Sequence, residues 1–391
     1  MRATVRGVAL TGAALVAVVV AAGAWVLSSG GTDTPPAGPP KTLRIITWNI
    51  CGEAGGERGQ SGYCPLRDRP EKKAEKIAAL ARERDADVIT LQEVCGGAPG
   101  SHVALLRSAL GPGWSVRHAE GARPDGETRC RDGLSGDLGV AVAVRGEIVR
   151  ARSQNALPRD PAGVSRQTLP VLCVRVSGWP YTPCTTHILP GEEPRVREQV
   201  AAVREFVRGE DRPAVLTGDF NRNSGAPQLD PLVSSFSVCP GTDEKGRGAV
   251  TYHGWDPEKR AHTFHELDHI FFDSPPGVKD PLVDCGVVTE LMDTTPNEPG
   301  GPGPDGYSDH APVYADLRVR APEEPVPGGS GSADRQPGAE RAPAGRELRG
   351  HMEPAVVAEG RHHGAAGGVE GDRRGAHDGA AQRGGRQLLP R

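Results

Sequence analysis

Residues 307–312 read Tyr-Ser-Asp-His-Ala-Pro, and an alternating apolar pattern follows at once in residues 313–317. An acidic residue beside an imidazole, immediately before a strand, is typical of catalytic groups at a strand end. The pair Asp309 and His310 is weak evidence alone, because short matches arise by chance. Its weight comes from the polar residues that stand beside other apolar runs earlier in the chain.

Five further polar clusters each adjoin an apolar run that has the composition of a buried strand. In chain order they are Trp48-Asn49, Gln92-Glu93, Thr186-His187, Gly218-Asp219-Phe220-Asn221 and Leu267-Asp268-His269-Ile270. One accidental match is expected in any chain, but several in a consistent order are not. The clusters therefore indicate one polar site assembled from many strand ends.

The chain between these clusters alternates short apolar runs with amphipathic stretches. The pattern predicts helices at 69–84, 103–110 and 194–208, and strands at 43–48, 88–91, 138–144, 171–176, 182–188, 214–217, 264–272 and 311–319. The segment 115–135 reads as a Cys- and Gly-containing loop. More strands than helices, with helices between some of them, predict packed sheets with helices outside.

Composition divides the 391 residues into four parts. A basic start followed by an apolar run predicts a signal peptide in 1–29, with a retained membrane anchor as the alternative. Residues 30–41 form a Pro/Gly linker, and 42–320 have the pattern of one globular catalytic domain. Residues 321–391 contain no Phe, Trp or Tyr and are expected to be a disordered low-complexity tail.

Eight cysteines in an exported chain predict disulfides. Nearest-neighbour pairing is one of the many arrangements that eight cysteines allow. It would join Cys51 to Cys64, Cys95 to Cys130, Cys173 to Cys184, and Cys239 to Cys285. The net charge of −4 argues against strong generic attraction to nucleic acid, although a local basic groove remains compatible with it.

Two of the clusters carry oxygen-rich side chains suited to metal and phosphate chemistry. Glu93 follows a buried strand, where a carboxylate can hold a hard cation such as Mg²⁺, or can simply cap the strand and face solvent. Asp219 and Asn221 are two residues apart and would share one face of an extended segment, with Phe220 packed behind them. The alternative is an ordinary turn, which Gly, Asp and Asn all favour.

His187 and His310 are the natural acid–base groups, and Asp268 is the best candidate to orient His310. Asn49 is expected to position Glu93 or a phosphate. A structural histidine and an asparagine that closes a turn are the plainer alternatives for these positions.

A competing motif lies at 265–269, where His265, Glu266 and His269 match the zinc-protease signature H-E-x-x-H. The motif needs a helix, so that the two histidines lie one turn apart. The β-rich composition here and the prolines that follow favour a strand. The match is therefore interpreted as accidental.

The ordered clusters resemble the endonuclease/exonuclease/phosphatase superfamily, which includes deoxyribonuclease I. The resemblance spans about 43–318, and its most specific parts are Gly218-Asp219-Phe220-Asn221 and Ser308-Asp309-His310. It implies a four-layer α/β sandwich of two packed, mostly antiparallel sheets with outer helices. It also implies hydrolysis of phosphate esters with Mg²⁺, or Mn²⁺ or Ca²⁺, as cofactor.

The resemblance also implies roles for these positions. Glu93 would be the main metal ligand, with Asn49 and Asp309 near the metal. The remaining implied residues are catalytic. Asp219 and Asn221 would position the attacking water and stabilise the phosphoryl oxygens. His310, paired with Asp268, would act as an acid or base or bind the scissile phosphate, and His187 would assist. Nucleases of this family carry an extra Tyr or Glu between the Gln-Glu strand and the strand that ends at the first catalytic histidine, here His187. No residue in 115–135 can be aligned with it. A carboxylate partner for His187 is also unassigned.

The sequence thus predicts an exported, Mg²⁺-dependent phosphodiesterase of nuclease type. Its expected substrate is a phosphodiester, nucleic acid first and phospholipid second, and the chain is expected to be a monomer without an obligate protein partner. It would be secreted or anchored to the outer face of the cell membrane. The alternatives are a sphingomyelinase or lipid/inositol phosphatase, a zinc protease, and a non-catalytic binding protein on the same fold.

Overall fold

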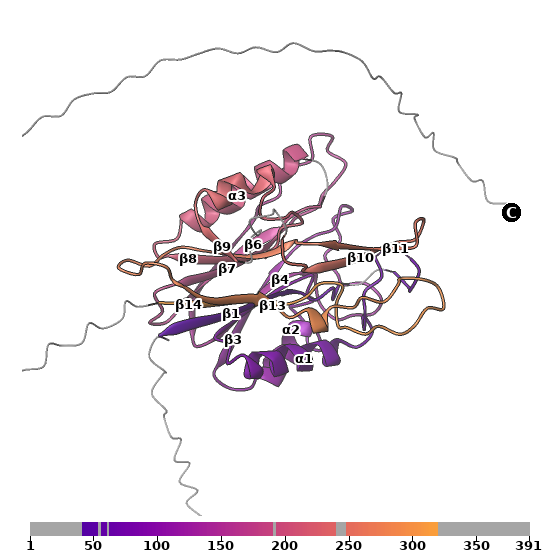
Figure 1. Ribbon diagram of the computed structural model, residues 1–391, viewed down its shortest axis with the longest axis horizontal. Coiled ribbons are helices and arrows are strands. Elements are labelled where there is room, and N and C mark those ends of the chain that lie inside the picture. Colours follow the sequence, from indigo (N-terminus) through magenta and orange to yellow (C-terminus); the bar gives the residue numbers. More distant parts are fainter. Residues whose placement is uncertain (1–40, 54–55, 61, 191–192, 240–247, 320–391) are drawn as a thin grey trace, which may run out of the picture. The chain divides into compact units, whose positions relative to one another are not determined.

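Two six-stranded β-sheets lie face to face, and helices cover the outer face of each sheet (Figure 1). The computed structural model describes residues 41–53, 56–60, 62–190, 193–239 and 248–319. These residues belong to one compact unit. The predicted signal segment, nearly all of the linker and the predicted tail lie outside the described residues.

The first sheet has the strand order β13-β14-β1-β2-β4-β3. Its strands are β1 Thr42–Asn49, β2 Val88–Gln92, β3 Trp114–Glu120, β4 Gly139–Arg145, β13 Leu282–Val287 and β14 Val313–Arg318. β1 and β2 are parallel, in a register that pairs Asn49 with Gln92, whereas the other neighbours are antiparallel. The register brings Glu93, the residue after β2, beside the end of β1.

The second sheet has the order β5-β6-β7-β8-β12-β9. Its strands are β5 Ile148–Asn155, β6 Pro170–Val176, β7 Thr182–His187, β8 Ala214–Asp219, β9 Ser237–Cys239 and β12 Asp268–Phe272. β7 and β8 are its parallel pair, with His187 opposite Asp219, and the antiparallel β12 places Asp268 opposite Asp219. Three polar residues from three clusters therefore lie side by side at one edge.

The three predicted helices are confirmed. α1 Pro70–Glu83 and α2 His102–Leu110 cover the first sheet, and α3 Glu193–Arg208 covers the second together with α4 Asp230–Val233 and the 3₁₀ turn Pro227–Leu229; a further 3₁₀ turn is Thr289–Leu291. Proline suits the first turn of α1, because the amide hydrogen it lacks would have no partner there. The layers are helix, sheet, sheet and helix, as predicted.

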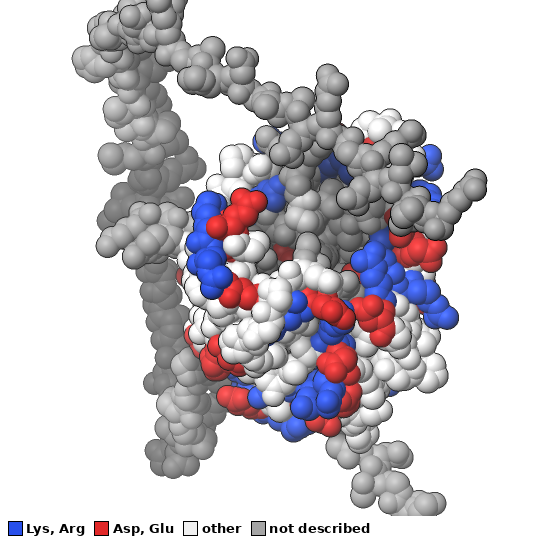
Figure 2. Space-filling model, turned by 90° about the vertical axis from the view of Figure 1, so that its right-hand side faces the viewer, with Lys and Arg blue, Asp and Glu red and all other residues white. Residues whose placement is uncertain are grey.

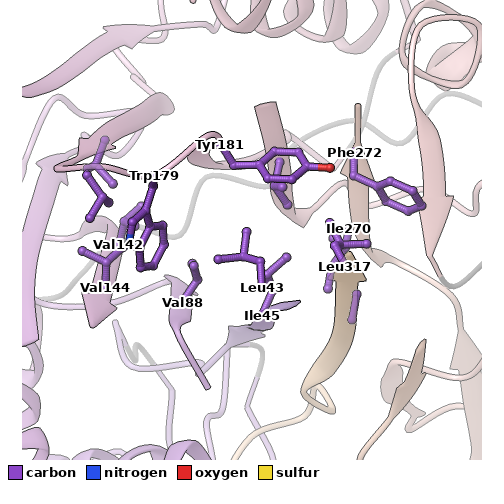
Figure 3. Close-up of a cluster of buried hydrophobic side chains, with 14 of the residues drawn as sticks. Leu43, Ile45, Val88, Val142, Val144, Trp179, Tyr181, Ile270, Phe272 and Leu317 are labelled. Atoms are coloured by element: carbon purple, nitrogen blue, oxygen red, sulfur yellow. The ribbon is translucent and has the colours of Figure 1, made fainter. Parts of the chain in front are cut away.

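The main core lies between the sheets, where apolar side chains from both inner faces meet (Figure 3). β1 shows why its sequence is a nearly continuous apolar run: Leu43 and Ile45 face the second sheet, whereas Ile46 and Trp48 face the helices of the first. A strand buried on both faces favours apolar residues on both of them. Trp179, beside the β6–β7 turn, is also buried in this core.

The prediction of one strand at 264–272 is wrong. The segment contains the end of β11 Ala261–His265, which pairs with β10 Tyr252–Asp256 in a separate two-stranded sheet, and then β12 in the second sheet. The chain changes direction at Leu267, where the N–H groups of Leu267 and Asp268 both donate to Thr251 Oγ1, at 2.9 and 3.0 Å. A local pattern does not reveal a side chain that breaks the strand from 16 residues away.

The prediction that 115–135 is a loop is wrong in its first part, because β3 spans Trp114–Glu120. β5 was missed as well, and most of its side chains are exposed. Both are edge strands, so each needs a partner strand on one side only. Backbone hydrogen bonds to that one partner are enough to hold an edge strand in place. An edge strand can therefore lack the apolar pattern by which a central strand is recognised in a sequence.

All four nearest-neighbour disulfides are confirmed: Cys51–Cys64, Cys95–Cys130, Cys173–Cys184 and Cys239–Cys285. The last bond joins β9 of the second sheet to β13 of the first. Such a set is typical of extracellular proteins. Within the described residues, no helix is long and apolar enough to cross a membrane, and the apolar run 7–27 lies outside them.

Candidate active site

The two sheets meet at an asparagine that bonds two carboxylates. Asn49 Nδ2 donates to Glu93 Oε1 at 3.1 Å and to Asp219 Oδ2 at 3.0 Å. Its oxygen accepts the N–H of Cys51 at 2.9 Å, which sets the orientation of the amide. Asn49 ends β1, and its contacts are those of a residue that orients the two carboxylates.

The buried His310 lies between Asp219 and a third carboxylate, that of Asp268. His310 Nδ1 is 2.8 Å from Asp268 Oδ2, and His310 Nε2 is 3.6 Å from Asp219 Oδ2. Burial disfavours the imidazolium, but the charges of Asp268, Asp219 and Asp309 outweigh burial and raise the pKa of His310 well above its usual value. These carboxylates therefore favour the protonated form of His310.

The Ser-Asp-His segment is attached to the end of β1. Ser308 Oγ donates to Asn49 O at 2.7 Å and accepts the N–H of His310 at 3.2 Å. Trp48 Nε1 donates to His310 O at 2.9 Å. These bonds join the polar end of β1 to the polar segment that precedes β14.

His187 has the carboxylate neighbour that the sequence left unassigned. Its Nε2 lies 3.5 Å from Asp219 Oδ2 and 3.2 Å from Asn221 Nδ2. The expected extended geometry of residues 219–221 is wrong, because Asn221 has φ of 51°. The left-handed turn still returns Asn221 to the site, where its N–H donates to Asp219 Oδ1 at 2.8 Å, while Phe220 is buried behind them.

Glu93 and Asp309 line a cavity of about 410 Å³ beside this cluster. Burial, followed by the charge of Glu93, raises the pKa of Asp309 to about 6, although His310 and Lys73 act in the opposite direction. Glu93 itself has φ of 50°, a strained conformation for a residue with a side chain. Such strain persists where surrounding structure enforces it, and it is frequent at functional sites.

Sequence reasoning missed Lys73, a buried lysine below the site. Its Nζ donates to Ile50 O at 2.6 Å and to Cys51 O at 3.1 Å, so it holds the loop that follows Asn49. Burial lowers its pKa to about 7, against the opposing charges of Asp309, Glu93 and Asp293. The available signal was a lysine one turn before Ile77, on the apolar face of α1.

The H-E-x-x-H match does not lie on a helix. His265 ends β11, and His269 lies in β12 of a different sheet. The buried Glu266 accepts the Ser224 N–H at 3.3 Å, and His269 Nε2 donates to Arg222 O at 2.7 Å. Glu266 and His269 thus hold the loop that follows Asn221.

Two carboxylates at the cavity fit a hard divalent cation. Glu93 and Asp309 could supply oxygen ligands, and the charge of Glu93 helps to raise the pKa of Asp309, a cost that a cation between them would relieve. Asp219, Asp268 and His310 also have ligand atoms within 4.8 Å of one another, but Asp268 and His310 already bond each other. Cys51 and Cys64, beside Glu93, share a disulfide and offer no thiolate.

A family model described as endonuclease/exonuclease/phosphatase family matches residues 46–310. The chain belongs to the endonuclease/exonuclease/phosphatase family. Members of this family are phosphoesterase hydrolases that generally use divalent metals. The match begins within β1 and ends at His310, so it contains every site residue described above.

Solved structures of this family are similar to the chain. An endonuclease/exonuclease/phosphatase from Bacteroides vulgatus is 18% identical, with 72% of this chain and 100% of that chain covered and a TM-score of 0.48. The mannosyl-6-phosphatase Bt3783 of Bacteroides thetaiotaomicron is 21% identical (70% and 99% covered, TM-score 0.48). TDP2 of D. rerio, complexed with a single strand DNA product, is 16% identical (71% and 99%, TM-score 0.47). No curated protein matches significantly.

Proposed function

We propose that the protein is an exported, divalent-metal-dependent phosphodiesterase, with Mg²⁺ as the expected ion and attack by water in line with the leaving group. The observation that carries the proposal is the pair of bonds from Asn49 to Glu93 and Asp219, because they join a cation-binding carboxylate to a water-binding one. The family match supports hydrolysis of a phosphate ester.

Each side chain of the cluster has a role that follows from its contacts. Asp219 accepts bonds from Asn49 and from the Asn221 N–H, and is thereby aimed to orient the attacking water. His310, held as a cation by Asp268, offers Nε2–H to a phosphoryl oxygen. Asn221 Nδ2 donates to Ile188 O and bonds His187 Nε2, so this amide holds His187 beside Asp219.

Glu93 and Asp309 would hold the metal, with Asn49 orienting Glu93. When bound, a divalent cation neutralises charge on the phosphoryl oxygens and favours attack. Lys73 keeps the Asn49–Cys51 loop in place from below, so its contribution is positional.

A phosphodiester of nucleic acid remains the preferred substrate, and export accords with the four disulfides and the apolar N-terminal run. Acidic and basic side chains are mixed on the face shown in Figure 2, so this face offers local contacts to a phosphate rather than a broad basic surface. The lipid-cleaving alternative is weakened, because Trp179 and Tyr181 are core residues, 4% and 0% exposed.

The decisive test is hydrolysis of plasmid DNA, RNA, sphingomyelin and inositol phosphates by the full chain, with Mg²⁺ and with chelator. We expect diester cleavage that the chelator abolishes. Glu93→Gln and His310→Asn should each lower the rate by at least about 100-fold, because the first removes a charged metal ligand and the second removes a donor to the phosphoryl oxygens. Glu120→Gln, an exposed glutamate on β3, is the matched control and should retain the wild-type rate.

Two results would refute the proposal. One is hydrolysis by the wild-type chain that proceeds at the same rate with chelator as with Mg²⁺. The other is full activity of His310→Asn on every diester that the wild type cleaves. Circular dichroism and thermal unfolding of each variant would separate loss of chemistry from loss of fold.

A further inference from the structure

Tyr252 begins β10, and the main chain on both sides of it is bonded to the segment that carries His310. The residue before it accepts the N–H of Ala311 at 2.8 Å, and the next residue, His253, donates its N–H to Asp309 O at 2.9 Å. An antiparallel bridge pairs Tyr252 with His310 itself. The fold therefore fixes Tyr252 relative to the catalytic histidine.

The tyrosine ring lies between that histidine and the cavity. Its centroid is 4.8 Å from the His310 ring, with the two planes tilted by 53°. Tyr252 lines the same cavity of about 410 Å³ as Glu93 and Asp309. A phosphate ester that reached the proposed metal carboxylates would therefore lie beside this side chain.

The hydroxyl of Tyr252 is a donor in an acidic environment. Among the described residues, no group has a hydrogen bond to it. Burial raises its pKa to about 12, and the charges of Asp309, Asp219 and Glu93 act in the same direction. The phenol therefore keeps its proton at neutral pH and can donate a hydrogen bond to an oxygen that enters the cavity.

We propose that Tyr252 is a further catalytic residue, whose hydroxyl donates to a non-bridging oxygen of the scissile phosphate; the inference rests on the proposed phosphoesterase function. The bond strengthens as negative charge gathers on that oxygen in the transition state. His310 would contact the phosphoryl group beside it. No proton is transferred, because the phenol acts only as a fixed donor.

The test compares Tyr252→Phe with wild type on bis(4-nitrophenyl) phosphate and Mg²⁺. We expect kcat to fall about 10- to 100-fold, the effect of one hydrogen bond to a charged acceptor, with KM changed by less than about 3-fold. The pH optimum should not move. Tyr314→Phe makes the same chemical change on β14, outside the cavity lining, and should retain the wild-type kcat.

A phosphorothioate analogue separates a direct bond from an indirect effect through His310. Sulfur is a weak hydrogen-bond acceptor, so the loss caused by Tyr252→Phe should shrink to less than about 3-fold on this substrate. An equal loss on both substrates would show that Tyr252 only positions His310. Wild-type kcat in Tyr252→Phe would also overturn the proposal.

Failure of the proposed function would be visible separately, as a wild-type protein without metal-dependent hydrolysis of any diester. In that case, binding of inorganic phosphate to the Mg²⁺-loaded protein, measured by calorimetry, still tests Tyr252. We expect Tyr252→Phe to weaken phosphate binding by about 5-fold or more. Equal affinity in the two proteins would refute the assignment.

Discussion

At the residue scale, the buried lysine Lys73 shows how the site depends on a charge that no motif marks. Lys73 is 1% exposed, and its ammonium group bonds the carbonyls of Ile50 and Cys51. The residues that the sequence did identify lie at strand ends or within a few residues of them. Their partners, such as Asp219 for His187, depend on strand register across a sheet, which a single sequence does not specify.

Lys73 makes stability depend on pH in a predictable direction. Its pKa is about 7 in the folded chain and 10.5 when unperturbed, so the unfolded chain binds more protons between these values. Stability therefore rises with pH in this window. Between pH 7.5 and 9.5, metal-free wild type should gain on the order of 2 kcal/mol relative to Lys73→Met, measured by urea unfolding.

The exposed neighbour Lys72 provides the control for this prediction. Lys72→Met should follow the wild-type dependence on pH throughout. If the Lys73→Met and wild-type curves stayed parallel, Lys73 would be fully charged in the folded chain and its burial would have no effect on its titration.

At the element scale, the central strands were predictable and the edge strands were not. β1, β2 and β8 are buried on both faces and appear as apolar runs. The chain path at 266–267, in contrast, is decided by Thr251 and by the partners of Glu266, which are distant in sequence. Asn221 likewise adopts a left-handed turn where an extended segment was expected.

Gly218 in β8 tests how closely the two parallel strands at the site must pack. Its φ is 151°, and a Cβ added there would lie 2.1 Å from Thr186 O of β7. Gly218→Ala should therefore cost about 2–4 kcal/mol in unfolding free energy and most of the activity, because His187 and Asp219 flank this contact. Gly225→Ala, where the nearest atom is 3.7 Å away, should change both by little. Equal stability of the two variants in urea would contradict this account.

At the scale of the whole molecule, the layered architecture was predictable because helix and strand periods differ along the chain. The site was predictable only as a set of residues, since its geometry arises where the two sheets meet. The bond between Asn49 of the first sheet and Asp219 of the second joins residues 170 positions apart. Interactions that hold the sheets in register should therefore also support activity.

The Cys239–Cys285 disulfide tests this dependence, because it is the described disulfide that joins the two sheets. It closes a separation of 46 residues, against 11 for Cys173–Cys184 within the second sheet. Loop entropy predicts that replacing Cys239 and Cys285 by serine lowers the free energy of unfolding by about 4 kcal/mol. The same change at Cys173 and Cys184 should lower it by about 3 kcal/mol. Urea unfolding of the two double variants would measure both costs. Activity should also be lost at lower urea concentration in Cys239→Ser/Cys285→Ser, whereas the opposite order would show that sheet–sheet packing alone holds the site together.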